Sequence, residues 1–352
     1  MKYGVFLPTA NNGWLISNTA PQYKPTWELE KRIALEAEAA GMDFAIAMVK
    51  LHGYGGQTEF WDYSLDSFTL IAGLAAVTER LQLFASVAVL AQHPAMVARM
   101  AMTLDAIAPG RVGVNMVSGW QKAEYAQMGL WPGDETHFRR RYDVMAEYAQ
   151  VLTELWREGT SDFKGEFFTL DQCRMKPTPS APIPICVAGQ SPEGMGFAAK
   201  WADFNLFMGR GCNTPTAHAP AFERLATAAA DAGRSVQPYS AFMIIVADTD
   251  EEAHARWERY REGADVEAIA WMTGQALADT TSDSASTAKT ISLPYGAVNL
   301  NTGTLVGSPE TVARLLNEAA ALTPDGGILL TFDNYVGGIR TFGERIRPLL
   351  DH

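Results

Sequence analysis

Short runs of apolar and β-branched residues recur along the chain, each bounded by turn residues. Most of these runs are apolar throughout instead of alternating with polar residues, which is typical of strands covered on both faces of a parallel sheet. The pattern predicts eight strands: Lys2 to Leu7, Asp43 to Met48, Leu81 to Val87, Arg111 to Val117, Ile183 to Ala188, Asp203 to Phe207, Ala241 to Val246 and Gly327 to Phe332.

Stretches with helical spacing of apolar residues lie between the predicted strands. They are Trp27 to Ala40, Ser67 to Thr78, Pro94 to Ala108, Arg141 to Trp156, Pro192 to Ala202, Ala219 to Ala232, Asp250 to Gly263 and Pro309 to Ala321. A strand followed by a helix, repeated in this way, predicts βα units. Eight such units favour an α/β fold of the closed (β/α)₈ TIM-barrel type over an open, doubly wound sheet.

The spacing of these units is uneven in three places, which predicts insertions at Pro8 to Pro25, Gly159 to Pro182 and Gly274 to Gly307. The second insertion has the pattern of a small hairpin, formed by Phe163 to Thr169 and Cys173 to Pro177. The third contains Asp279 to Thr290, whose Ser, Thr and Asp content predicts a mobile lid or a disordered loop. Because no linker run occurs, we expect one domain over residues 1–352.

Composition excludes several classes of partner. The formal net charge is -12, so the surface should repel nucleic-acid phosphates and anionic membranes. No apolar stretch approaches the ~20 residues of a membrane span, and the N-terminus lacks a signal-peptide core. Cys173, Cys186 and Cys212 form no CxxC pair, which favours reduced thiols. We therefore expect a cytoplasmic protein that binds neither nucleic acid nor membrane.

The common sequence signatures of other enzyme classes are missing. The six histidines lack HxH or HExxH spacing, so no metal site is expected. No GxGxxG, GxxxxGK[ST] or GxSxG motif occurs, which removes support for Rossmann, P-loop and α/β-hydrolase chemistry. A barrel without an evident nucleophile suits a flavin enzyme, since the cofactor itself performs the redox chemistry.

Candidate site residues should follow the carboxyl ends of the strands, where TIM barrels place their active sites. Lys50 follows the second strand and is a candidate cation for a substrate carbonyl, and Glu124 follows the fourth as an acceptor for a substrate N–H. Taken singly, each is more simply interpreted as a solvated loop charge. Trp120 is more often a packed aromatic than a stacking surface. Asn115 stands inside an apolar strand, so its amide needs a partner if it is buried.

Two segments are candidate phosphate sites. Ser191 precedes Pro192 in the form of a helix N-cap, and a helix N-terminus offers free N–H groups to a phosphate. The alternative is a simple cap, which Glu193 in the first turn mildly favours. The run from Arg139 to Tyr142 begins another predicted helix, where an arginine can hold a phosphate through two hydrogen bonds, although such runs are usually solvated surface.

Several blocks, in the same order and spread over the whole chain, resemble the RutA-type pyrimidine oxygenases of the bacterial-luciferase superfamily. They include Asn11 to Ser17, Gly55 to Asp62, Val117 to Lys122, Met128 to Asp134, Ala188 to Ser191, Asn213 to Thr216, Gly303 to Ser308 and Phe342 to Arg345. The resemblance implies a luciferase-like barrel that uses O₂ and reduced FMN supplied by a separate NADH-dependent flavin reductase. It also implies opening of the uracil or thymine ring between N3 and C4 to a ureidoacrylate species, and homo-oligomers are common among such proteins.

The resemblance also assigns site residues. It implies flavin contacts from Val49, Lys50, Asn115, Glu124, Arg141, Tyr142 and Ser191. The catalytic candidates are Lys50, Asn115, Glu124, Ser86 and Trp120. We expect Lys50 and Glu124 to orient the substrate ring, and Asn115 with Ser86 to hold oxygen or the reactive flavin atoms.

The chain departs from the family pattern in three places. Asp134 to Arg139 is one residue longer, which leaves open whether Arg140 or Arg141 meets the FMN phosphate. Ser86 stands where threonine is expected, and Gln57 where lysine is expected. The alternatives are a related two-component flavin monooxygenase acting on another cyclic amide or heterocycle, a flavin- or pyrimidine-binding protein without turnover, and a metal-dependent barrel hydrolase.

Overall fold

Eight parallel strands close into a barrel in the computed structural model, which describes residues 1–279, 286, 287, 289 and 297–351. The barrel strands are β1 (Lys2–Leu7), β2 (Phe44–Ala47), β3 (Gln82–Ala88), β4 (Val112–Val117), β7 (Ile185–Val187), β8 (Phe204–Met208), β9 (Gln237–Val246) and β11 (Gly327–Phe332). The pairings β1–β11 and β8–β9 close the ring. The predicted TIM-type barrel is confirmed, and its strands are the eight predicted from the apolar runs.

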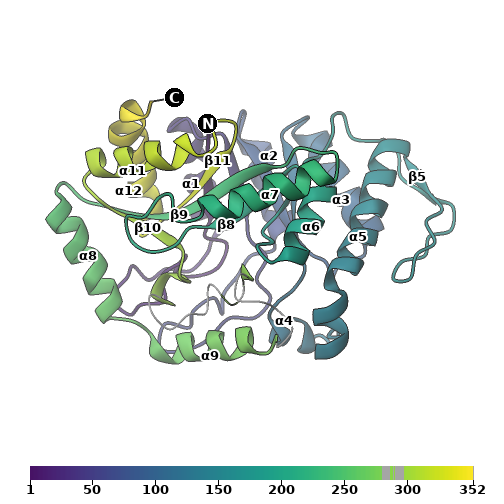
Figure 1. Cartoon of the computed structure of the whole chain (residues 1–352), viewed down its shortest axis with the longest axis horizontal. Helices are drawn as coiled ribbons and strands as arrows, with labels where there is room; N and C mark the ends of the chain where they lie inside the picture. The colour runs from purple at the N-terminus through teal and green to yellow at the C-terminus, as the bar shows by residue number, and fades with distance from the viewer. Residues whose placement is uncertain (280–285, 288, 290–296, 352) are drawn as a thin grey trace.

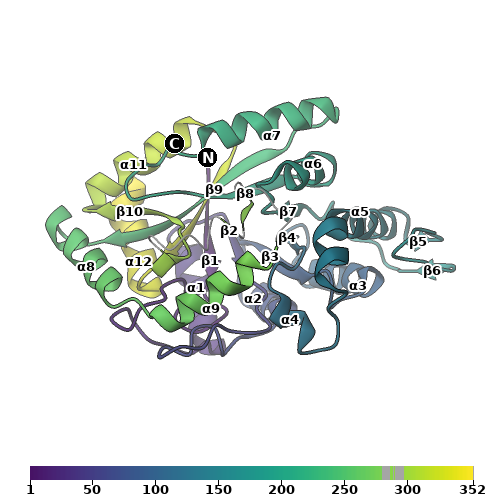
Figure 2. The same cartoon turned by 60° about the horizontal axis from the view of Figure 1, so that its bottom comes forward.

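Helices surround the barrel on its outer face (Figures 1 and 2). They are α1 (Trp27–Ala39), α2 (Ser67–Val77), α3 (Pro94–Ile107), α5 (Asp134–Glu158), α6 (Pro192–Trp201), α7 (Ala219–Asp231), α8 (Asp250–Glu262) and α11 (Pro309–Ala321). Several begin at a polar residue whose side chain accepts a first-turn N–H, as Thr26, Asp66 and Thr249 do. Local sequence therefore fixes where these helices start.

The helix expected to begin near Arg139 instead begins at Asp134. Gly133 adopts a positive φ of 102°, which ends the preceding loop, and two acidic residues follow in the first turn. The arginine run therefore lies more than a turn inside α5, and the prediction that it starts the helix is wrong. The early turns of α5 are rich in charged residues, so they lack the apolar spacing from which the start was predicted.

Four further elements have no counterpart among the predicted strands and helices: α4 (Lys122–Ala126), α9 (Val266–Leu277), β10 (Gly303–Gly307) and α12 (Tyr335–Thr341). Strand β10 pairs with the second half of β9, whose first half pairs with β8. It is five residues long and bounded by glycines, which hid it within the third predicted insertion. The described residues also form the short helical turns η1 (Ala297–Asn299), η2 (Phe342–Ile346) and η3 (Arg347–Leu349).

The insertions have distinct structures. The second forms an antiparallel hairpin of β5 (Thr160–Ser161) and β6 (Cys173–Arg174), which projects from the body of the molecule in Figure 1. This confirms the predicted hairpin, with its first strand earlier than expected. The first insertion packs on the loop after β2, where Asn11 and Asn12 donate side-chain hydrogen bonds to backbone carbonyls. Most of the predicted lid, Asp279 to Thr290, lies outside the described residues.

Helices α4 and α9 lie at the edge of the molecule opposite the two chain termini, and α9 passes in front of the barrel in Figure 2. The carboxylate of Asp265 caps α9 and accepts hydrogen bonds from the backbone and hydroxyl of Thr58, both at 2.8 Å. This contact ties α9 to the loop after β2. Within the described parts of the chain, no helix is both long and apolar enough to cross a bilayer.

One buried carboxyl group sets a pH dependence of stability. Glu30 in α1 is fully buried, and within the described structure neither carboxyl oxygen has a hydrogen-bond partner. Burial raises the pKa of Glu30 from its ordinary 4.5 to about 8. The folded chain therefore keeps this group protonated up to a higher pH than the unfolded chain does.

The free energy of unfolding of the wild type should fall as pH rises from 4.5 to about 8, and we predict that Glu30→Gln removes this fall. In the wild type, the unfolded chain releases the Glu30 proton in this window while the folded chain retains it, so the free energy of unfolding falls as pH rises. Urea denaturation across the window should show a shallower slope for the variant. The exposed Glu28, in the same helical turn, supplies the control Glu28→Gln, which should keep the wild-type slope. An unchanged slope in Glu30→Gln would contradict the assignment.

Candidate active site

A cavity of about 210 Å³ opens among the carboxyl ends of the barrel strands. Its wall contains every residue that the sequence assigned to the site, namely Val49, Lys50, Ser86, Asn115, Trp120, Glu124, Arg141, Tyr142 and Ser191. These residues come from β3, β4, α4, α5 and the loops that follow β2, β4 and β7. The barrel therefore brings together segments that are far apart in the sequence.

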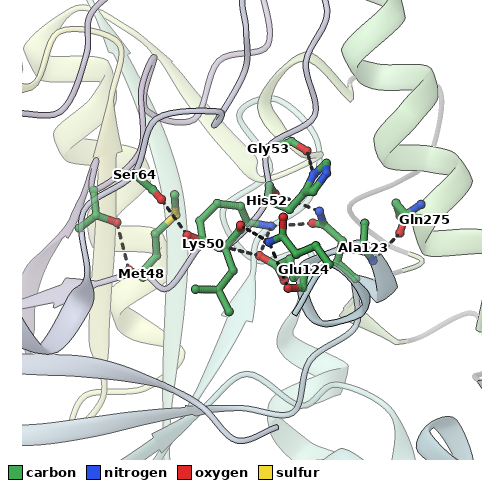
Figure 3. A network of polar contacts seen from close by, with 12 residues as sticks. Met48, Lys50, His52, Gly53, Ser64, Ala123, Glu124 and Gln275 are labelled. Atoms are coloured by element: carbon green, nitrogen blue, oxygen red, sulfur yellow. Dashed lines mark hydrogen bonds and ion pairs between the residues drawn. The ribbon is translucent and has the colours of Figure 1, made fainter. Parts of the chain in front are cut away.

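A buried ion pair stands in the wall of this cavity (Figure 3). The Nζ atom of Lys50 lies 2.9 Å from Oε1 of Glu124, and the two side chains are 5% and 8% exposed. The same Glu124 oxygen accepts the backbone N–H of Leu51 at 3.0 Å. The sequence interpretation of these residues as solvated loop charges is therefore wrong. The loop after β2 and helix α4, which follows β4, contact each other at the barrel mouth and bury both side chains.

Aromatic rings surround the Lys50 ammonium group. Its Nζ atom lies 5.0 Å from the ring centre of Tyr54, 5.1 Å from Trp61 and 5.6 Å from Trp120. Burial lowers the pKa of Lys50, while the charge of Glu124 and the hydrogen bond to it act in the opposite direction. The negative faces of the rings also favour a cation at this position.

The turn after β4 places Trp120 against this group. Gly119 adopts a φ of 82°, and a Cβ there would lie 2.7 Å from the ring of Tyr125, so only glycine fits. The carbonyl of Gly119 is hydrogen-bonded to Nε2 of His137 in α5. Burial lowers the pKa of His137 to about 4, which keeps its ring neutral at pH 7. Trp120 is half-buried and lines the cavity, so it is both packed and presented to a ligand.

Asn115 and Ser86 meet on neighbouring strands. The Asn115 amide nitrogen lies 2.8 Å from Oγ of Ser86, and the β3–β4 register places the two residues side by side. This gives Asn115 the partner that its burial requires. Its carbonyl oxygen, however, is buried without a hydrogen-bond partner in the described structure.

Unpaired polar atoms gather at this cavity. Besides Asn115 Oδ1, the described structure leaves Trp14 Nε1, Tyr54 OH and Arg141 Nε buried without a partner, and all four residues line the cavity. Unpaired buried polar groups are rare in folded proteins because each loses its hydrogen bonds to water. Such a concentration at one cavity indicates a polar ligand.

The far end of the cavity has features suited to an anion. Ser191 caps α6 and accepts the backbone N–H of Gly194 at 3.2 Å, which confirms the predicted N-cap. A Cβ at Gly194 would lie 2.7 Å from the hydroxyl of Tyr142, so a glycine here lets Tyr142 approach the first turn of α6. Arg141 is buried, with its Nη1 atom 2.8 Å from Oδ2 of Asp279.

Arg140, the alternative phosphate ligand, lies elsewhere. It pairs on the surface with Asp143 at 2.6 Å and Glu166 at 2.7 Å and does not line the cavity. Consecutive residues of a helix point about 100° apart, so only one of the two arginines can face the barrel. Of the two, Arg141 is the one at the cavity. Gln57, the third departure from the family pattern, is exposed outside the cavity wall.

Comparisons with known proteins agree with this geometry. The family model for luciferase-like monooxygenases matches residues 1–326. The chain belongs to the luciferase-like monooxygenase family. This luciferase-like monooxygenase is 57% identical over 350 residues to the pyrimidine monooxygenase RutA of Enterobacter cloacae, covering 99% of the chain and 96% of the relative. The corresponding protein of Escherichia coli is 56% identical, with coverage of 99% and 91%.

Solved structures show the same fold at low sequence identity. A riboflavin lyase matches with a TM-score of 0.84 at 20% identity, covering 99% of this monooxygenase and 91% of that chain. An EDTA monooxygenase from Chelativorans matches with a TM-score of 0.81 at 17% identity, with coverage of 99% and 93%. At these identities the likeness concerns the fold alone.

Sequence reasoning missed several residues of the monooxygenase site. Gln121 accepts a hydrogen bond from Lys50, and Asp279 accepts one from Arg141. The aromatic part of the cavity wall includes Trp14, Tyr54 and Trp61. Trp14 and Trp61 stand in two of the blocks on which the family resemblance rests, and those blocks were the signal that could have found them. Among the described residues, no group of three or more His, Cys, Asp or Glu side chains is arranged to hold a metal ion.

We predict strong coupling between Lys50 and Glu124 in the stability of the monooxygenase. Lys50→Met should destabilise the protein by about 3–5 kcal/mol, because it leaves the Glu124 carboxylate buried without its counter-ion. The double variant Lys50→Met, Glu124→Gln should recover most of that loss. Urea denaturation of the two single variants and the double variant measures the coupling. Additive losses would show that the two charges do not stabilise each other.

Proposed function

We propose that this monooxygenase opens the ring of uracil or thymine oxidatively between N3 and C4, giving a ureidoacrylate species, with reduced FMN and O₂. The observation that carries the proposal is the buried Lys50–Glu124 pair in the cavity wall. It offers a hydrogen-bond donor beside an acceptor, which matches the adjacent C=O and N–H groups of a pyrimidine ring. The pyrimidine monooxygenases at 56–57% identity support the same substrate class.

The residues at the cavity fit FMN. Ser191, Tyr142 and Arg141 would hold its phosphate at the start of α6, where backbone N–H groups and a guanidinium favour an anion. Val49, Lys50, Asn115 and Glu124 would contact its ring system at the strand ends. The unpaired Asn115 oxygen and Arg141 Nε are polar atoms that such a ligand can satisfy.

When bound, reduced FMN supplies the electrons and activates O₂. In the proposed mechanism, Lys50 donates a hydrogen bond to a pyrimidine carbonyl, and Glu124 accepts a ring N–H. Asn115 and Ser86 hold oxygen beside C4, and Trp120 packs against the substrate ring. The aromatic wall keeps water from the reacting atoms. We also propose that a separate NADH-dependent flavin reductase supplies the reduced FMN in the cytoplasm, and that the enzyme is a homo-oligomer.

We predict that purified protein supplied with FMN, NADH, a flavin reductase, O₂ and uracil forms a ring-opened product detectable by mass spectrometry. Lys50→Met should lower its rate of formation at least about 100-fold, because a charge-assisted hydrogen bond in a dry site contributes several kcal/mol. Lys122→Met, which changes a neighbouring exposed lysine, should keep the wild-type rate. Product from another cyclic amide but none from uracil or thymine would refute the substrate assignment.

Arg141 and Arg140 supply a second matched comparison. We predict that Arg141→Lys weakens FMN binding about tenfold. The planar guanidinium group of arginine can donate hydrogen bonds to Asp279 and to a phosphate at the same time, whereas the ammonium group of lysine cannot reach both. Arg140→Lys should leave affinity unchanged. Titrations monitored by flavin fluorescence should show the Arg141 effect with FMN and not with riboflavin, which lacks the phosphate. Equal weakening of both ligands would place the phosphate away from Arg141.

A further inference from the structure

Gln121 makes a contact with the reactive site that the sequence did not assign. It immediately precedes α4 and is completely buried. Its Oε1 atom lies 2.6 Å from Nζ of Lys50, and its Nε2 atom lies 3.0 Å from the backbone carbonyl of His52. Although it occupies the N-cap position of α4, its side chain makes no capping hydrogen bond. Its polar atoms are directed to the loop after β2.

The two contacts fix the orientation of the Gln121 amide. Lys50 carries only donors at its ammonium group, and the His52 carbonyl is only an acceptor. Rotating the amide by 180° would place its NH₂ against the ammonium and its oxygen against the carbonyl, which loses both hydrogen bonds. The observed orientation is therefore the one that satisfies both partners.

The ammonium group has three N–H bonds, and two acceptors are accounted for. Oε1 of Gln121 and Oε1 of Glu124 lie at 2.6 Å and 2.9 Å from Nζ. Lys50 itself lines the cavity. Among the described residues these two oxygens are the acceptors of the ammonium group, so its third N–H is left for a ligand in the cavity.

We propose that Gln121 is a positioning residue: its amide oxygen holds the Lys50 ammonium group beside Glu124 so that the third N–H meets the substrate carbonyl. This inference rests on the proposed function of Lys50. The oxygen of a neutral amide stabilises the ammonium form without adding a second carboxylate to a buried site. Removing that oxygen favours the neutral amine, and replacing it by a carboxylate favours the cation.

The other groups that face Lys50 are one carboxylate, one phenol and two indoles. Glu124 from α4 is its ion-pair partner, and burial raises the pKa of Tyr54 well above 10, so this phenol stays neutral. Trp61 and Trp120 carry no ionisable group. The ring of His52 turns instead to the Gly53 carbonyl and stacks on Trp271 of α9. Lys50 is therefore the group whose deprotonation should limit activity at high pH.

The test compares Gln121→Met, which keeps the length but removes the acceptor, with Gln121→Glu, which adds a carboxylate. The control is Gln127→Met: Gln127 also ties the Lys50 loop to α4, through the Leu51 carbonyl at 2.6 Å, but does not contact Lys50. The readouts are the pH profile of kcat/KM for uracil and, in flavin-free protein, the pH titration of the Lys50 side chain by nuclear magnetic resonance.

Gln121→Met should move the basic limb of the profile, and the Lys50 titration, down by about one pH unit, which corresponds to the loss of one hydrogen bond to a charged group. Gln121→Glu should move both upward, and Gln127→Met should move neither. A Lys50 titration that stays in place in both Gln121 variants would overturn the inference. A Lys50 titration that moves without any movement of the activity profile would instead overturn the catalytic role proposed for Lys50.

Discussion

The buried ion pair between Lys50 and Glu124 is the constraint around which the candidate active site is organised. Two charges removed from water destabilise a fold unless geometry and further hydrogen bonds compensate them. Here the compensation comes from the Leu51 N–H, the Gln121 oxygen and three aromatic rings. Meeting those requirements fixes the loop after β2 against α4. These contacts hold the part of the cavity wall where a substrate would need to be oriented.

The barrel supplies the remainder of the site through its register and connections. Ser86 and Asn115 are paired by the β3–β4 register, so their contact follows from strand alignment. Helix α9, from the late part of the chain, packs on α4, where its Gln275 accepts the backbone N–H of Ala123 (Figure 3). The positions of the catalytic candidates thus depend on contacts between segments distant in sequence.

Much of the fold was predictable from the sequence because most residues of the barrel strands are apolar. Elements without that pattern, such as α9 and β10, were not found. The site residues were named from family blocks and strand ends, and they do share one cavity. The contacts were not predictable: nothing local shows that Gln121 reaches Lys50, or that Asp279 reaches Arg141. A single sequence gives residue types near a strand end, while burial and pairing depend on the complete tertiary structure.

The pairing that completes the barrel joins its first and last strands, Lys2 with Gly327 and Val5 with Leu330. During synthesis β1 leaves the ribosome long before its partner β11, because more than three hundred residues separate them in the chain. One edge of the nascent sheet therefore keeps unpaired backbone groups until β11 has been made, a state that invites pairing with other chains. Chaperone protection of that open edge would matter most in the interval before β11 emerges.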